Sequence, residues 1–264
     1  MNRWFRFPGV QAASAALIAC GVLATLVMAL PAWTSGANPS LAERVQRIED
    51  ENAIVRLQNI YGYYVDKRLF DQVVDLFADS GSVEISHRGV YTGKAGVKRL
   101  FIDSWSGDGL GLRHGQLFTH MMMQPVIDIA PDGRHARGRF RTFAQVGQHE
   151  RGVMWVEGVY ENEFIKEGGI WKYSRMRFWP TYYVPEREGF SGKLLPNMEV
   201  DRNHPPDLPP TDDAGVFPDV YYPPFHYPNP VTGKEVDVNP YNHKALAETT
   251  TARKWTGDEP VHGK

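Results

Sequence analysis

The chain has 264 residues, a formal net charge of −2 and 42% hydrophobic residues, enough for one domain with a hydrophobic core plus extensions. A nearly neutral chain without a basic run offers no electrostatic reason to bind nucleic acid. The single cysteine, Cys20, excludes an intrachain disulfide framework and a cysteine-based zinc site.

The N-terminal residues 1–37 have the order of a targeting segment. Arg3 and Arg6 precede an apolar run over residues 12–30, and the small residues Ser35-Gly36-Ala37 follow. This is the order of a secretory signal, although the run is also long enough to remain as an uncleaved anchor. The stretch Leu17–Cys20 resembles a lipoprotein cleavage site, which is a third alternative. We therefore expect an exported protein, periplasmic or secreted, or one tethered on the outer side of a membrane by residues 12–30.

After residue 37, the first patterns in the sequence are helical. Ser40 and Glu43 form a capping box, which predicts a helix over about 41–64. Its apolar positions roughly keep a helical period: Leu41, Val45, Ile48, Val55 and Leu57. The following pattern predicts a short helix at about 71–78, a short strand at 82–86 and a third helix at 93–105.

The period then changes from helical to two, which predicts four strands at about 117–130, 135–147, 151–166 and 170–179. Turn signals separate them at Pro131-Asp132-Gly133 and at Glu167-Gly168-Gly169. Helices followed by a meander predict an α+β domain over residues 38–185. We expect a cone-shaped half-barrel, in which three N-terminal helices pack on a curved, mainly antiparallel sheet and a ligand lies between them.

The composition changes again over residues 186–264, where prolines interrupt every periodic pattern and tyrosines lie between them. One interpretation is a disordered polar tail. The other is an extended Pro/Tyr-rich C-terminal arm, which lies on its own domain or on a neighbouring subunit. The last residues, from about 248, have the composition of a disordered end.

A set of proton-transferring side chains lies at the ends of two predicted elements. Asp66 follows the end of the long helix, and His120 opens the first long strand. Histidine accepts and returns protons near neutral pH, and a carboxylate can fix its tautomer. Tyr61 and Tyr64 are one helical turn apart and either add hydroxyl groups to such a site or only pack in the core.

Five motifs in order resemble the SnoaL-like family of the nuclear-transport-factor-like cone fold, in the branch of scytalone dehydratase and the bile-acid dehydratase. They are Tyr61 with Asp66-Lys-Arg-Leu-Phe-Asp71, Phe77-Ala-Asp79, Gly93-Lys-Ala-Gly96, Thr119-His120 with the strand to Ile129, and Gly169-Ile-Trp171-Lys-Tyr173. The resemblance implies that Asp66 and His120 form the catalytic dyad. It also implies that Tyr61 polarises a carbonyl or holds a water.

The sequence departs from this family pattern at two positions. A carboxylate of the bile-acid enzyme falls at Ala144, and an arginine near the end of its last strand falls at Pro180. Arg175 and Arg177 are the candidates to replace that arginine. We expect five residues to contact a substrate: Tyr64, Arg175, Arg177, Trp155 and Phe140.

These features predict a cofactor-independent lyase of the dehydratase type that acts on an apolar, ring-containing small molecule by His/Asp acid–base catalysis. Two alternatives remain: a retro-aldol type carbon–carbon lyase for lignin-derived aromatics, and a non-catalytic module that binds a hydrophobic ligand. The sequence contains no metal-ligand spacing, no glycine-rich nucleotide loop and no serine-hydrolase motif, so we expect neither a metal nor a cofactor. We expect a homo-oligomer, either a dimer or a trimer.

Overall fold

A computed structural model describes residues 38–107 and 109–242. The helical elements are α1 (Leu41–Asp66), α2 (Phe70–Asp75) and α3 (Gly93–Lys98), which continues into a π-helix at Arg99–Ser104. The strands are β1 (Phe77–Ile85), β2 (Val90–Thr92), β3 (Gln116–Ile129), β4 (His135–Gln148), β5 (Gly152–Glu167) and β6 (Ile170–Pro185). The expected leader or anchor at 1–37 lies outside the described residues. None of the helices within the described ranges is both long and apolar enough to cross a membrane.

Helix α1 begins with the capping box, since Ser40 Oγ accepts a hydrogen bond from Glu43 N at 3.2 Å and Glu43 Oε2 accepts one from Ser40 N at 2.7 Å. The buried face of the helix is made by Ile54, Gln58, Tyr61 and Val65, at helical spacing. The expected apolar stripe was therefore wrong at its start. Leu41, Val45 and Ile48 are exposed, because the first turns of α1 lack contact with the hydrophobic core.

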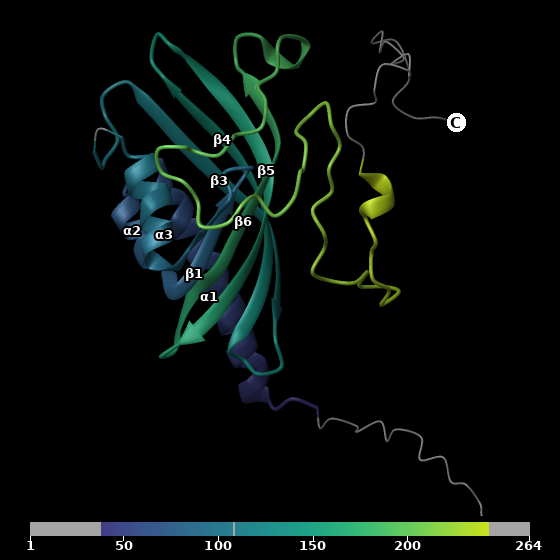
Figure 1. The fold of residues 1–264 in the computed structure, drawn as a ribbon. Coiled ribbons are helices and arrows are strands. Elements are labelled where there is room, and N and C mark those ends of the chain that lie inside the picture. The colour runs from purple at the N-terminus through teal and green to yellow at the C-terminus, as the bar shows by residue number, and fades with distance from the viewer. Residues whose placement is uncertain (1–37, 108, 243–264) are drawn as a thin grey trace, which may run out of the picture. The chain divides into compact units, whose positions relative to one another are not determined.

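The six strands form one curved, open sheet in the order β2-β1-β6-β5-β4-β3. Neighbouring strands are antiparallel except for β1 and β6, which are parallel. The helices cover one face of this sheet (Figure 1). The fold class predicted from the sequence is thus confirmed, with three differences: β1 begins at Phe77, within the predicted second helix, instead of at about 82, β2 was not predicted, and β6 extends to Pro185 instead of about 179.

Two bulges in β6 decide which of its side chains face the helices. Its pairing with β5 skips Ser174, between Tyr173 and Arg175, and skips Thr181 further along. Each extra residue reverses the alternation of the side chains that follow it. Tyr173, Phe178 and Tyr183 therefore all belong to the buried core between sheet and helices.

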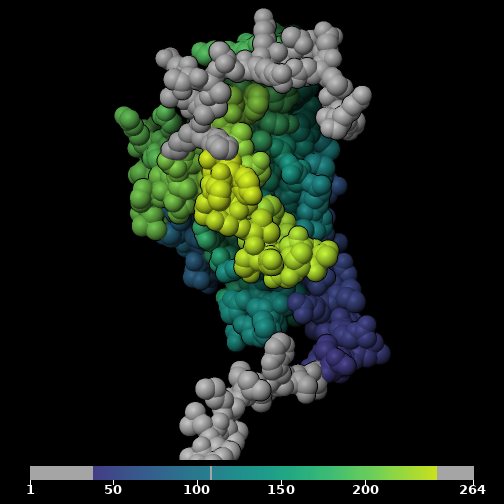
Figure 2. All heavy atoms as spheres, turned by 90° about the vertical axis from the view of Figure 1, so that its right-hand side faces the viewer, coloured from purple at the N-terminus to yellow at the C-terminus, as the bar shows by residue number. Residues whose placement is uncertain are grey.

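The described part of the arm, residues 186–242, runs as extended chain against the domain. Its first half crosses the β2 edge, where Leu208 forms a bridge with Val90 and Asp201 accepts a hydrogen bond from Ser104. Its second half lies across the sheet face away from the helices (Figures 1 and 2). There Asp212 pairs with Arg177 on β6, and His226 bonds to Glu161 on β5. These contacts show the arm lying on its own domain.

Candidate active site

A cavity of about 250 Å³ lies between the helices and the inner face of the sheet. Most of its wall is apolar, from the residues Val65, Phe70, Ile85, Phe118, Ala144, Val146, Met154, Val156, Phe178 and Met198. A few polar side chains also line it, from the residues Tyr61, Arg88, Trp105, His120, Thr142, Tyr160 and Tyr183. Such an apolar chamber with a small number of polar groups is typical of a site for a small organic ligand.

His120 and Asp66 meet at the wall of this cavity. Asp66 is the last residue of α1, and His120 lies on β3, opposite Ala144 of β4. His120 Nδ1 lies 3.0 Å from Asp66 Oδ1, and the two side chains are 15% and 13% exposed. A carboxylate on Nδ1 favours the proton on that nitrogen and leaves Nε2 as the acceptor. The hydrogen bond between the two residues is thus present as expected, while their catalytic roles stay predictions.

A pair of phenols forms a second polar group in the cavity. The hydroxyl oxygens of Tyr61 and Tyr160 lie 3.3 Å apart, and both side chains are buried. Burial raises the pKa of Tyr61, an effect that the hydrogen bond with Tyr160 only partly opposes. Burial also raises the pKa of Tyr160 well above its usual value. Both hydroxyl groups therefore stay protonated at neutral pH, when they can act as hydrogen-bond donors.

Tyr160 was not among the predicted site residues, although the strand pattern contains a signal for it. Along β5 the alternation puts Met154, Val156 and Tyr160 on one face, and these three line the cavity. Tyr183 was missed because the predicted strand ended at about 179, whereas β6 extends to Pro185. Its hydroxyl lies 2.5 Å from Ser86 Oγ, and burial raises the pKa of Tyr183 to about 12.

None of the five residues expected to contact a substrate lines this cavity. Trp155 lies on the opposite face of β5 from Val156, and its ring packs 6.5 Å from that of Phe143. Phe140 is 1% exposed within the hydrophobic core. The side chains of α1 that line the cavity are those of Tyr61 and Val65. Tyr64 packs against the hydrophobic core instead.

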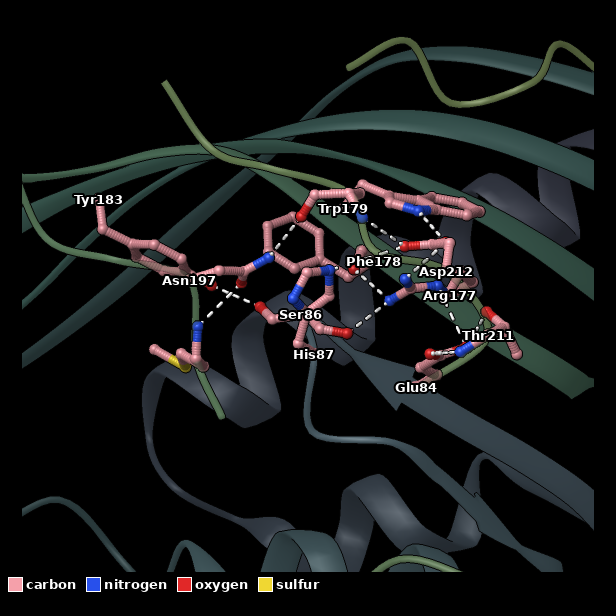
Figure 3. Close-up of polar contacts among 12 residues, drawn as sticks. Glu84, Ser86, His87, Arg177, Phe178, Trp179, Tyr183, Asn197, Thr211 and Asp212 are labelled. Carbon is pink, nitrogen blue, oxygen red and sulfur yellow. Dashed lines mark hydrogen bonds and ion pairs between the residues drawn. The ribbon is translucent and has the colours of Figure 1, made fainter. Parts of the chain in front are cut away.

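The two arginines of β6 were also assigned to the wrong face. The bulge at Ser174 turns Arg175 and Arg177 away from the helices. The side chain of Arg175 is 44% exposed, and its Nη1 lies 3.8 Å from Glu163 Oε1. Arg177 is fully buried under the arm, where it contacts two carboxylates (Figure 3). Neither arginine replaces the family arginine that is missing at Pro180.

The cluster around Arg177 attaches the arm to the sheet (Figure 3). Arg177 Nε lies 3.2 Å from Glu84 Oε2, and Nη2 donates to Asp212 Oδ2 at 3.0 Å. Trp179 Nε1 donates to the same Asp212 oxygen at 2.8 Å. Burial alone would raise the pKa of Asp212, but the ring of His87, whose Nε2 lies 3.7 Å from Oδ1, and the charge of Arg177 hold it well below its usual range. The cluster is a structural anchor and lies outside the cavity.

Groups of three or more histidine, cysteine or acidic residues that would suit a metal ion are absent from residues 38–107 and 109–242. Helices packed on one face of a curved, open sheet, with a histidine–aspartate hydrogen bond at the wall of an apolar cavity, define the class of protein as a cone-shaped α+β fold. A model of the SnoaL-like domain matches residues 46–177, half of the chain, so this protein belongs to the SnoaL-like family.

Solved structures offer more distant likenesses. A provisionally assigned scytalone dehydratase from Novosphingobium aromaticivorans is 19% identical, with a TM-score of 0.46, covering 53% of this chain and 90% of its own. A hexachlorocyclohexane dehydrochlorinase, LinA type 2, is 21% identical, with a TM-score of 0.47 and coverages of 54% and 92%. The type 3 enzyme from Novosphingobium barchaimii is 19% identical, with a TM-score of 0.46 and coverages of 54% and 93%. A search of curated proteins finds no match.

Proposed function

We propose that this protein is a cofactor-independent lyase of the dehydratase type for a small, apolar, ring-containing compound. The observation that carries the proposal is the hydrogen bond between His120 Nδ1 and Asp66 Oδ1 at the wall of an apolar cavity. A buried histidine–carboxylate pair can be purely structural, as His226 and Glu161 are where the arm meets the sheet, but only His120 of these two histidines lines the apolar cavity. An acid–base catalyst needs such a pair at the cavity, because the carboxylate fixes the tautomer and the orientation of the imidazole.

In the proposed reaction, His120 removes a proton from a carbon next to an activating carbonyl group. The electron pair of that carbon–hydrogen bond forms a carbon–carbon double bond, and the carbon–oxygen bond to a neighbouring hydroxyl group breaks. The hydroxyl group leaves as water with the proton that His120 returns, so the imidazole ends the cycle neutral. Asp66 stabilises the imidazolium that exists between the two proton transfers.

Tyr61 has the polarising role in this proposal. A phenol is protonated at neutral pH, and burial raises the pKa of Tyr61 further, so its hydroxyl can donate a hydrogen bond to a carbonyl oxygen that gains negative charge. Tyr160, whose hydroxyl lies 3.3 Å away, orients that donor. A positioned acid–base group typically accelerates a reaction by about 10²–10⁴-fold, and the rest comes from positioning and from such donors.

The test uses the full chain and a panel of one- and two-ring β-hydroxy ketones, with and without an acidic group. One member is 3-hydroxy-1-tetralone, whose dehydration gives 1-naphthol and is followed by fluorescence. We expect turnover of at least one member by the native chain and its loss in His120→Ala. Turnover by His120→Ala equal to that of the native chain would exclude the proposed base.

A matched control is His149→Ala, since His149 is 77% exposed and lies outside the cavity. This variant should retain full activity. A different result would favour the retro-aldol alternative over dehydration. In that case every panel member would be bound but none dehydrated, and an aryl β-hydroxy ketone without a ring hydroxyl would be cleaved to two carbonyl products.

A further inference from the structure

The cavity contains hydrogen-bonding atoms that are not satisfied within the described chain. Three of its lining residues have a buried side-chain atom without a hydrogen-bond partner there: Arg88 Nε, Trp105 Nε1 and Thr142 Oγ1. Two of these atoms are N–H donors. Buried polar atoms are nearly always hydrogen-bonded, and leaving one unsatisfied costs free energy. Their concentration around one cavity indicates a ligand with oxygen acceptors.

The two donors belong to neighbouring side chains. Arg88 lies in the turn between β1 and β2, and its guanidinium carbon is 5.4 Å from the centre of the Trp105 ring. Arg88 Nη2 donates to the sulfur of Met198 at 3.2 Å, a contact that the arm provides. A thioether is a weak acceptor and carries no charge, so this bond leaves the guanidinium charge uncompensated.

The carboxylate near Arg88, that of Asp201, acts on it only from a distance. Burial lowers the pKa of Arg88, and the charge of Asp201 opposes this effect. Asp201 itself accepts hydrogen bonds from Ser104 Oγ and from the backbone of Asn203. Of the ion pairs formed by the described residues, none includes Arg88. Arg88 therefore presents a positive charge to a mostly apolar chamber.

Arg177, which is fully buried, shows how this protein balances the charge of a guanidinium that has only a structural role. Arg177 contacts both Glu84 and Asp212, so its charge is balanced within the chain. An unbalanced charge in an apolar place is costly and is kept where function requires it. The contrast between the two arginines points to a negative ligand group at Arg88.

We infer that the cavity binds a small ring compound that carries one carboxylate group, with Arg88 paired to the carboxylate and Trp105 Nε1 as a second donor. The planar guanidinium fork matches a planar carboxylate, which favours this group over a neutral carbonyl. A volume of about 250 Å³ suits one or two rings and not a larger skeleton. The inference rests on the proposed function only in taking this ligand as the substrate.

The experiment measures equilibrium binding of two matched probes, 2-naphthoate and the neutral 2-naphthamide, to the full chain by isothermal titration calorimetry. We expect the native chain to bind naphthoate at least about tenfold more tightly than naphthamide, in line with a charge-assisted hydrogen bond. Arg88→Met should remove this preference and leave naphthamide binding unchanged. Arg88→Lys keeps the charge but not the fork, and should retain part of the preference.

Control variants separate this inference from the proposed function and from folding defects. Arg175→Met removes an exposed arginine outside the cavity and should keep the full preference for naphthoate. His120→Ala should abolish dehydration without changing the preference, so the two proposals fail independently. Equal affinity of the native chain for both probes, or no binding of either, would overturn the carboxylate assignment. A preference that survives in a folded Arg88→Met would overturn the role of Arg88.

Discussion

Arg177 and Glu84 lie opposite each other in the parallel pair of strands β6 and β1, and their side chains are only 1% and 2% exposed. The two strands thus share a buried ion pair on the face of the sheet that the arm covers. The arm adds Asp212 to the same guanidinium, with Nη2 and Oδ2 3.0 Å apart. The charge of Arg177 is therefore paired with one carboxylate from the sheet and one from the arm, which couples the arm to the sheet.

This relationship predicts that Arg177→Leu destabilises the protein by about 3–5 kcal/mol, because it leaves the carboxylate of Glu84 buried without its partner. The free energy of unfolding in urea, followed by tryptophan fluorescence, measures the effect. Arg175→Leu is the matched control, since an exposed ion pair contributes no more than about 1 kcal/mol. Equal losses for the two variants would contradict the structural role assigned to Arg177.

The depressed pKa of Asp212 predicts how stability depends on pH. At a pH between the folded and the unfolded pKa of Asp212, this carboxyl group is protonated in the unfolded chain but not in the native chain. The free energy of unfolding therefore rises with pH in that range. The contribution is complete above the unfolded pKa of about 3.9 and is lost as the pH falls through the folded value. Asp212→Asn should lower the free energy of unfolding at pH 7 and flatten its dependence on pH below about 4.

Urea unfolding at a series of pH values between 3 and 7 tests this directly. Glu199→Gln, at an exposed position on the same arm, is a charge-matched control. A steep acid dependence that is identical in Asp212→Asn would show that other carboxylates cause it.

His120→Ala should lower kcat/KM by at least about two orders of magnitude on any substrate that the panel identifies. Asp66→Asn should lower it nearly as much, because Asp66 stabilises the imidazolium; a much smaller loss would leave Asp66 only the role of orienting the ring. Both variants should keep the native melting temperature within a few degrees, because neither removes core volume. Steady-state kinetics together with thermal unfolding distinguish a catalytic loss from a folding loss.

Tyr61→Phe separates packing from chemistry, because it keeps the ring and deletes the hydroxyl. The loss of the hydrogen bond to Tyr160 should cost no more than about 1.5 kcal/mol of stability. If the hydroxyl polarises the substrate, kcat should fall by at least about tenfold while KM changes little. Tyr63→Phe, at a position 72% exposed, is the control and should behave like the native chain. An active Tyr61→Phe would leave Tyr61 as a core residue only.

Local patterns were sufficient for much of the fold. The capping box at Ser40 set the start of α1, and period-two alternation with turn signals placed β3, β4 and β5 within two residues of their observed bounds. These features depend on neighbours in the sequence, so they can be read without a structure. The family resemblance then singled out Asp66 and His120, which do form a hydrogen bond.

Tertiary structure decided which side chains share the cavity. The bulge at Ser174 exists only relative to β5, and it moved Arg177 out of the predicted site, while Tyr183 lines the cavity on a part of β6 that was not predicted as strand. Arg88 lies in a short turn without periodicity, and it reaches the cavity because β1 pairs with β6 far along the chain. Alternation along one strand specifies two faces, but only pairing with the other strands and with the arm determines what each face contacts.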